Sequence, residues 1–181
     1  MKKHITTFGG LLLTCGQKKK RICEFLQEQE AHITDLNIAQ VREKAKKSLD
    51  AMKEAIKIGL NSHEKSISNL CGDDCIKLQK SYVNKPALFG KIFEKVTTYA
   101  LATIEENLRM GKIVACPTAG SCAIVPSVLV DIAEELNISE EEQISALITA
   151  GGIGAIVQYK VALAGAVAGC QAECGVAASM A

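Results

Sequence analysis

The stretch Gly165-Ala-Val-Ala-Gly-Cys-Gln-Ala-Glu-Cys-Gly175 decides how the chain packs, because nearly every side chain in it is small. Small residues let two backbones approach closely, which predicts a tight helix–helix contact here. Cys170 and Cys174 stand four residues apart and share one face if the segment is helical. Gln171 and Glu173 add polar groups to an apolar run, which is costly unless they do chemistry or are fully hydrogen-bonded. The plainer interpretation is a helix crossing with two buried, inert thiols.

The composition is that of a globular protein with one domain. The 181 residues are 48% hydrophobic and 23% charged, which allows a real core. Aromatic residues make up only 4%, so the core is built from Ala, Ile, Leu and Val, which favours packed helices. A net charge of +1 gives no reason to expect nucleic acid as a partner. Eight cysteines without a signal-peptide pattern predict a reducing, cytoplasmic location.

The apolar region near the C-terminus has to be examined as a possible membrane-spanning helix. Its uninterrupted part, Ile144 to Val157, is shorter than the ~20 residues that a spanning helix needs. Gln158 and Lys160 then interrupt it. We therefore expect a buried central helix and no membrane contact.

Capping residues and helical periodicity predict an all-α, bundle-like fold, with 1–181 as a single helical domain. Residues 1–20 are expected to be a weakly patterned N-terminal segment. Glu105 and Glu106, four and three residues before Arg109, predict an exposed helix face. The expected helices run over 22–30, from a cap at Thr34 or Asp35 to Leu60, from a cap at Asp73 or Asp74 to Tyr82, from Pro86 to Met110, from Pro126 to Leu136, and from Ser139, in a capping box with Glu142, to Val157.

A second informative stretch is Gly111-Lys-Ile-Val-Ala-Cys-Pro-Thr-Ala-Gly-Ser-Cys122. Pro117 and Gly120 impose an irregular loop ahead of a helix. Thr118, Ser121 and the backbone N–H groups of such a loop could hold an anion such as a carboxylate. An ordinary turn with a capping serine is the alternative.

Two further signals are weak. Cys71 and Cys75 lack the C-x-x-C spacing of zinc or thioredoxin-like sites. His63 lies in a polar connection, with no second histidine or carboxylate spaced to join it, so we interpret it as a surface residue.

Four segments together resemble one family. Lys112-Ile-Val-Ala-Cys-Pro-Thr-Ala-Gly-Ser-Cys-Ala-Ile-Val-Pro126 resembles the signature loop of the iron–sulfur-dependent L-serine dehydratases, alpha (catalytic) chain. Gly169-Cys-Gln-Ala-Glu-Cys-Gly-Val-Ala-Ala-Ser-Met180 is similar to the first cluster-cysteine segment of that family. Leu70-Cys-Gly-Asp-Asp-Cys-Ile-Lys-Leu78 is similar to its Gly-Gly-Asp segment, and Ala150-Gly-Gly-Ile-Gly154 is in register. The resemblance covers residues 20–181 in the family's order.

This resemblance implies an all-helical catalytic domain carrying a [4Fe-4S] cluster held by three cysteines. The open iron acts as a Lewis acid on L-serine, which is deaminated to pyruvate and ammonia. It also implies a beta chain or regulatory domain as a partner, and an oligomer. The catalytic base is not identified.

Residue by residue, Cys170 matches the first cluster ligand. Thr118, Ala119, Gly120 and Ser121 match the loop that holds the substrate, so we expect this loop and Cys170 to face one cavity within about 15 Å of each other. Asp73 matches an acidic position of unknown role.

Other cysteines could complete the cluster. Cys174 lies one helical turn from Cys170, and if both ligate, the third thiolate has to come from Cys116 or Cys122. Cys174 and Cys116 are themselves departures from the family, which mostly has apolar or small residues there.

The family's remaining two cluster cysteines lie downstream of the position matching Cys170, whereas this chain stops at Ala181. The fold is therefore expected to be incomplete at its C-terminus, and the chain alone is expected to show neither a bound cluster nor activity. Lys160–Gly169 also lacks the family's usual hydroxyl and amide groups. A related cysteine desulfidase and a non-catalytic, cysteine-rich helical fragment are the alternative functions.

Overall fold

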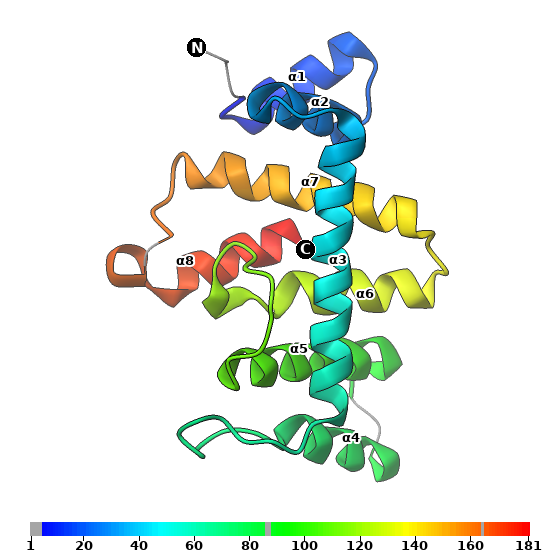
Figure 1. Cartoon of the computed structure of the whole chain (residues 1–181), viewed down its shortest axis with the longest axis vertical. Helices are drawn as coiled ribbons and strands as arrows, with labels where there is room; N and C mark the ends of the chain where they lie inside the picture. Colours follow the sequence, from blue (N-terminus) through cyan, green and yellow to red (C-terminus); the bar gives the residue numbers. More distant parts are fainter. Residues whose placement is uncertain (1–4, 86–87, 164) are drawn as a thin grey trace.

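The computed structural model describes residues 5–85, 88–163 and 165–181, which form helices joined by loops (Figure 1). No strand occurs among these residues, which confirms the predicted all-α class. The elements are α1 (Phe8–Lys18), α2 (Ile22–Thr34), α3 (Ile38–Asn61), α4 (Asp74–Asn84), α5 (Gly90–Leu108), the 3-10 turn η1 (Ala119–Ser121), α6 (Ile124–Glu135), α7 (Glu140–Gln158) and α8 (Gly165–Met180).

Helix α3 is the axis across which most of the other helices are laid (Figure 1). Asn37 caps its N-terminus in a capping box with Gln40. The Asn37 side chain accepts from the Gln40 backbone amide, and the Gln40 side chain accepts from the Asn37 backbone amide, both at 2.9 Å. The predicted cap at Thr34 or Asp35 is therefore wrong. Asp35 instead ends α2 in the left-handed conformation, with φ 55°.

The close contact of α3 with α5 depends on one glycine. A Cβ placed on Gly59 would lie 2.1 Å from the backbone oxygen of Ala102. The missing side chain thus lets the two helix backbones touch.

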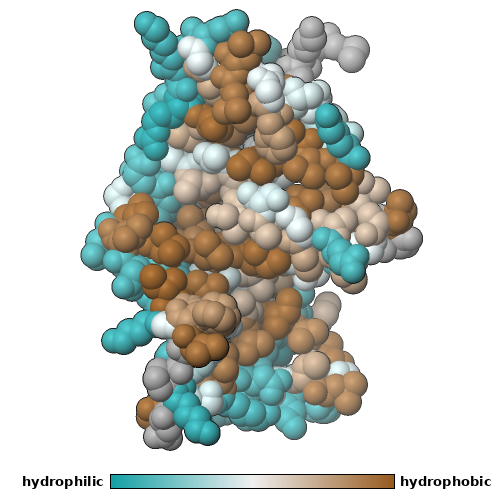
Figure 2. All heavy atoms as spheres, turned by 180° about the vertical axis from the view of Figure 1, so that it is seen from behind, coloured by the Kyte–Doolittle hydropathy of each residue, from teal (hydrophilic) through white to brown (hydrophobic). Residues whose placement is uncertain are grey.

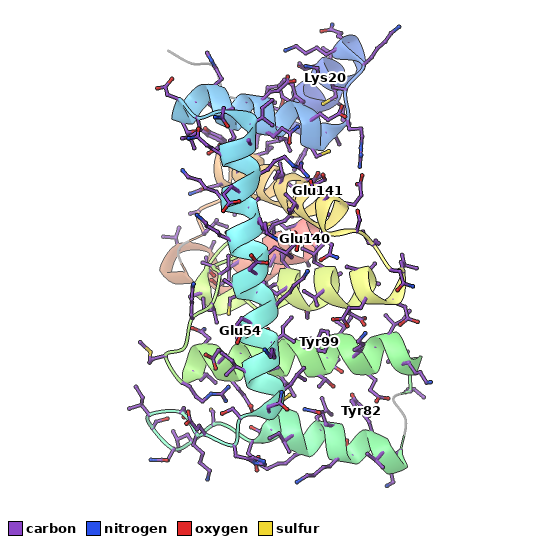
Figure 3. All side chains as sticks on the ribbon, turned by 45° about the vertical axis from the view of Figure 1, so that its right-hand side comes forward. Lys20, Glu54, Tyr82, Tyr99, Glu140 and Glu141 are labelled. Carbon is purple, nitrogen blue, oxygen red and sulfur yellow. The ribbon has the colours of Figure 1, made fainter. Side chains whose placement is uncertain are left out.

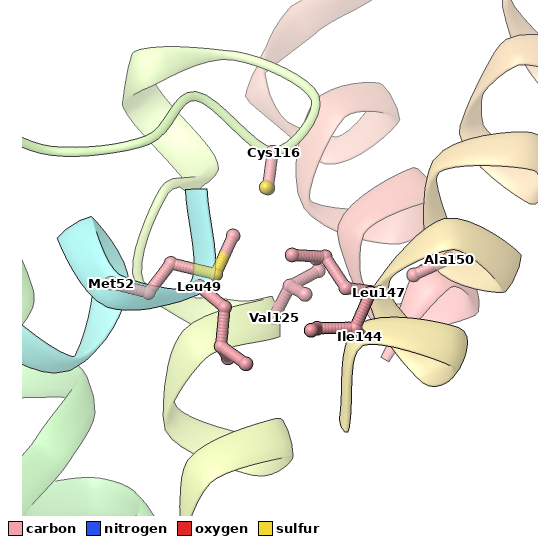
Figure 4. Packing of buried hydrophobic residues seen from close by; sticks show 7 residues of the cluster. All are labelled: Leu49, Met52, Cys116, Val125, Ile144, Leu147 and Ala150. Carbon is pink, nitrogen blue, oxygen red and sulfur yellow. The ribbon is translucent and has the colours of Figure 1, made fainter. Parts of the chain in front are cut away.

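The main core cluster joins α3, α6, α7 and the loop before η1 (Figure 4). Cys116 is the loop's contribution, and Met180 near the end of α8 packs against the same cluster. The core therefore anchors both of the segments that the sequence analysis singled out. Its buried members are Leu49, Met52, Cys116, Val125, Ile144, Leu147 and Ala150.

Helix α7 is the predicted buried central helix, since it packs against α2, α3, α6 and α8. Ser139 caps it as predicted, accepting from the Glu142 amide at 3.4 Å. The reciprocal half of the capping box is absent because the Glu142 carboxylate pairs with Arg21 of the α2 cap instead. The neighbouring Glu140 and Glu141 face α3 (Figure 3), where their ion-pair partners lie.

No helix within the described residues is long and apolar enough to cross a membrane. Apolar side chains nevertheless spread over the face seen from behind (Figure 2). Several large ones are strongly exposed, among them Leu13 (64%), Leu88 (90%) and Phe89 (72%).

Within the weakly patterned segment, Phe8–Lys18 form helix α1. Thr7 caps α1 by accepting from the Gly10 amide at 3.1 Å. Leu11 and Cys15, four residues apart, are buried against Phe25 in a second small core. Two buried positions one helical turn apart are enough to pack a short helix against the core. The glycines of α1 make this apolar spacing hard to recognise in the sequence.

Two other helices begin at residues other than the prolines predicted to start them. Helix α6 begins at Ile124, so Pro126 is its third residue and not its first. Helix α5 begins at Gly90, and the predicted start at Pro86 lies outside the described residues. A proline is tolerated anywhere in the first turn, because those N–H groups lack helical partners.

The predicted exposed face at the end of α5 is wrong. The side chains of Glu105, Glu106 and Arg109 are buried, with Arg109 Nη2 3.0 Å from Glu106 Oε2 and Arg109 Nη1 3.7 Å from Glu105 Oε2. Glu105 Oε1 also accepts from the amides of Asp74 and Cys75 at 2.6 and 3.2 Å. A carboxylate from α5 thus caps the N-terminus of α4.

Candidate functional site

The loop that carries Thr118–Ser121 is held at both ends by buried cysteines. Cys116 precedes it and Cys122 follows it, and both side chains are almost fully buried. Burial raises the pKa of Cys116 to about 11 and raises the pKa of Cys122 as well. Both therefore remain neutral, unreactive thiols near pH 7, which suits packing residues.

Inside the loop the Thr118 and Ser121 hydroxyl groups lie next to each other. Ser121 Oγ, which is buried, donates to the Cys116 carbonyl oxygen at 3.1 Å and lies 3.2 Å from Thr118 Oγ1. Asn107, in the last turn of α5, donates its amide to the Ala119 carbonyl oxygen at 3.0 Å. The loop is thereby fixed to the core and to the end of α5.

The loop also contacts α8 through Glu173. The Thr118 hydroxyl donates to Glu173 Oε2. Glu173 Oε1 lies over Gly120, where an added Cβ would be only 2.7 Å away. Glu173 is three residues beyond Cys170, so the two lie on adjacent turns of one helix, with Cβ atoms about 5–6 Å apart.

The structure thus brings the predicted substrate loop beside the helix that carries Cys170. A substrate cavity shared by the two remains a prediction. In the sequence, Glu173 stands out as a polar residue in an apolar run, but no spacing indicates Thr118 as its partner.

Cys170 and Cys174 are both exposed, so the interpretation as buried packing thiols is wrong. Gly169 explains their position: its φ of 73° and ψ of 168° interrupt α8, and Cys170 opens the helical stretch that follows. Glycine adopts such angles without a steric penalty.

The described thiols do not make up a complete cluster site. A cluster held by three cysteines requires three thiolates to converge. Among the described residues, no group of three histidine, cysteine, aspartate or glutamate side chains is placed to hold a metal ion. The exposed Cys170 is free to act as one ligand, whereas Cys116 and Cys122 are enclosed in the core.

A histidine–carboxylate pair that sequence reasoning missed lies just before α4. His63 Nδ1 lies 2.8 Å from Asp73 Oδ1, although the two are ten residues apart. Asp73 adopts φ 69°, which turns the chain back toward His63 before α4. Close by, Cys75 is fully buried and its thiol donates to the Thr98 carbonyl oxygen at 3.5 Å, which makes it a packing residue.

A separate cavity of about 750 Å³ lies between α2, α3 and α7. Its wall is mostly apolar, with Leu26, Ile33, Val41 and Ile148 among the lining residues. The wall also carries the charged Glu30 and Lys44. None of its lining residues belongs to the Thr118–Ser121 loop or to α8, so the loop is the better candidate for the site that the resemblance implies.

Comparison with known proteins indicates one family for this chain. The family model described as serine dehydratase alpha chain matches residues 17–181. A probable L-serine dehydratase alpha chain of Bacillus subtilis is 38% identical over 173 residues, covering 90% of this chain and 57% of the relative. The L-serine dehydratase alpha chain of Peptoniphilus asaccharolyticus is 30% identical over 178 residues, covering 98% and 61%.

An L-serine dehydratase of Helicobacter pylori is 35% identical over 178 residues, covering 90% of this chain and 39% of that protein. The chain therefore spans less than two thirds of the length of these relatives. The family match nevertheless extends over most of the sequence, including the Thr118–Ser121 loop and α8. The chain belongs to the serine dehydratase alpha-chain family.

Proposed function

We propose that this chain forms the substrate-binding part of a lyase that converts L-serine to pyruvate and ammonia. The observation that carries the proposal is the contact between Thr118 and Glu173. It joins the two segments, far apart in sequence, that resemble the family's substrate loop and cluster helix. Relatives named L-serine dehydratase support serine as the substrate.

The loop is suited to the carboxylate of serine. Ala119 and Gly120 are exposed and small, which leaves their backbone accessible. The Thr118 and Ser121 hydroxyls donate their hydrogens to Glu173 and to the Cys116 carbonyl oxygen, so they hold the loop in place. The backbone N–H groups of Ala119 and Gly120 are the donors proposed for the carboxylate. In the reaction the substrate loses its α-proton and its hydroxyl, and the resulting aminoacrylate is hydrolysed to pyruvate and ammonia.

We propose Cys170 as the contribution of this chain to a [4Fe-4S] cluster. Such a cluster supplies Lewis-acid chemistry at the leaving hydroxyl when it is bound. Because the described residues do not bring three thiolates together, the other ligands would come from protein outside these residues. Cys174, Cys122 and Cys116 are the weaker candidates within the chain.

We also propose a partner. Two of the relatives are named alpha chains, which suggests a beta chain as the counterpart here or an oligomer of the assembled enzyme. Exposed apolar side chains such as Leu88 and Phe89 support a protein interface. All eight cysteines are free thiols, which supports a reducing, cytoplasmic setting.

Anaerobic reconstitution with iron and sulfide tests the function. The chain alone is compared with an extended protein in which the part of the Bacillus subtilis relative that follows the matched region is joined after Ala181. We expect four irons per chain and pyruvate from L-serine in the extended protein only. Cys170→Ser should abolish both, while Cys71→Ser, a matched change away from the site, should abolish neither.

Sulfide release from L-cysteine in place of pyruvate release from L-serine would contradict the substrate. Pyruvate formation by a Cys170→Ser protein with a full iron content would contradict the proposed role of Cys170 as a cluster ligand.

A further inference from the structure

Glu173 is a half-buried carboxylate that has no counter-ion within the described part of the chain. Other carboxylates removed from solvent have one: Glu106 lies 3.0 Å from Arg109, and Asp131 lies 3.4 Å from Lys95. No lysine, arginine or histidine described here lies within ion-pair distance of Glu173. An uncompensated charge in such a place is costly unless something else supplies the opposite charge.

The carboxylate is nevertheless held in one place. Oε2 accepts from the Thr118 hydroxyl, and Oε1 lies over the bare Cα of Gly120. Thr118 is in turn fixed by its amide, which donates to Ser121 Oγ at 3.5 Å, while Ser121 donates to the Cys116 carbonyl oxygen. A neutral hydroxyl orients the charge without cancelling it, so the carboxylate keeps its capacity to bind a cation.

The geometry points to Glu173 as the group that binds the ammonium of an α-amino acid. This inference rests on the proposed function, in which the neighbouring loop takes the substrate carboxylate. An α-amino acid carries its ammonium and its carboxylate on the same carbon, so their partners in the protein have to be neighbours. Glu173 and the Thr118–Ser121 loop are in contact, as this requires.

The role predicts specificity as well as affinity. A site with Glu173 selects amino acids, because an analogue with a hydroxyl in place of the ammonium leaves the carboxylate without its counter-ion. The acceptor of the substrate's α-proton would behave differently, since its loss lowers kcat with little effect on binding. A purely structural link between the loop and α8 would weaken the binding of every ligand equally.

The test compares the dissociation constants of L-serine and L-glycerate, its analogue lacking the ammonium, on the full chain and on Glu173→Gln. We expect the wild-type chain to prefer L-serine. Glu173→Gln should weaken L-serine by about 10- to 100-fold, the size of one charge-assisted hydrogen bond, and leave L-glycerate unchanged or tighter. Glu135→Gln, the same change at an exposed position of α6, should alter neither constant.

The other outcomes are also decisive. Equal weakening of both ligands, or no weakening of either, overturns the role of Glu173 while serine binding itself survives. A wild-type chain that binds neither ligand overturns the proposed function together with this inference. Circular dichroism melting of each variant separates loss of binding from loss of the fold.

Discussion

Two places in the molecule bring a glutamate against a glycine, and they differ in how the charge is treated. Glu106 packs against Gly111, is buried, and is paired with Arg109. Glu173 packs against Gly120, is half-buried, and meets only the neutral Thr118 hydroxyl among the described residues. The first arrangement holds the C-terminal end of α5 in place, where all three residues lie.

The second arrangement leaves a fixed charge facing an accessible loop. The difference teaches that the presence of a counter-ion, more than the degree of burial, distinguishes a structural carboxylate from one that is available to a ligand.

The largest expected effect is at the compensated site. Arg109→Met leaves Glu105 and Glu106 buried without a cation and should lower the free energy of unfolding by about 3–5 kcal/mol. Urea denaturation measures this. Lys57→Met, which removes an exposed partner of Glu54, is the control and should change little. A loss at Arg109 no greater than at Lys57 would show that the buried pairing does not stabilise the fold.

A matched pair of glycine substitutions sharpens the comparison. Gly111→Ala places a Cβ 1.8 Å from Glu106 Oε1, and Arg109 prevents that side chain from moving away. Its expected cost is about 1–3 kcal/mol. Gly120→Ala meets only the end of the flexible Glu173 side chain, so its cost in stability should be near zero while L-serine binding falls. Equal costs in urea denaturation would erase the distinction.

Thr118 should have a smaller effect on folding. Thr118→Val removes the hydroxyl that orients Glu173 and should cost about 1 kcal/mol or less, because both groups can then reach water. Thr118→Ser restores the donor and should restore L-serine affinity. If Val and Ser variants bind equally well, the hydroxyl does not position the carboxylate.

The smallest effect is expected in thiol protection. Cys170 and Cys174 should react with a thiol reagent in the native chain, whereas Cys116 should not. With its pKa raised to about 11 by burial, the Cys116 thiolate is about one part in a thousand at pH 8 and grows only as the pH rises toward that value. Glu173→Gln should leave this protection intact, since the core and not Glu173 encloses Cys116. Rapid labelling of Cys116 in that variant would reassign Glu173 as a structural latch.

Much of the fold could be predicted because its signals are local. The Ser139 cap and the periodicity of α3 were visible in the sequence, and α7 was visible as a long apolar run after that cap. Asn37 was missed because Thr34, Asp35 and Asn37 are equally good caps, and only packing selects one. The burial of Glu105 and Arg109 was missed because the same i,i+4 spacing occurs on exposed and on buried helix faces.

The site was predictable in its parts and not in its contacts. Resemblance to a family marked the Thr118–Ser121 loop and Cys170. Glu173 and Thr118 are 55 residues apart, and His63 and Asp73 are joined by a turn with positive φ, so no spacing rule connects them. Tertiary structure supplied both pairs.

The most direct test of the account is to locate L-serine on the chain by NMR titration of backbone amides. The account predicts shifts that saturate together at residues 118–121 and 170–173, and that need about 10- to 100-fold more L-serine to saturate in Glu173→Gln. Saturable shifts confined to the cavity between α2, α3 and α7, with the loop unchanged, would contradict it.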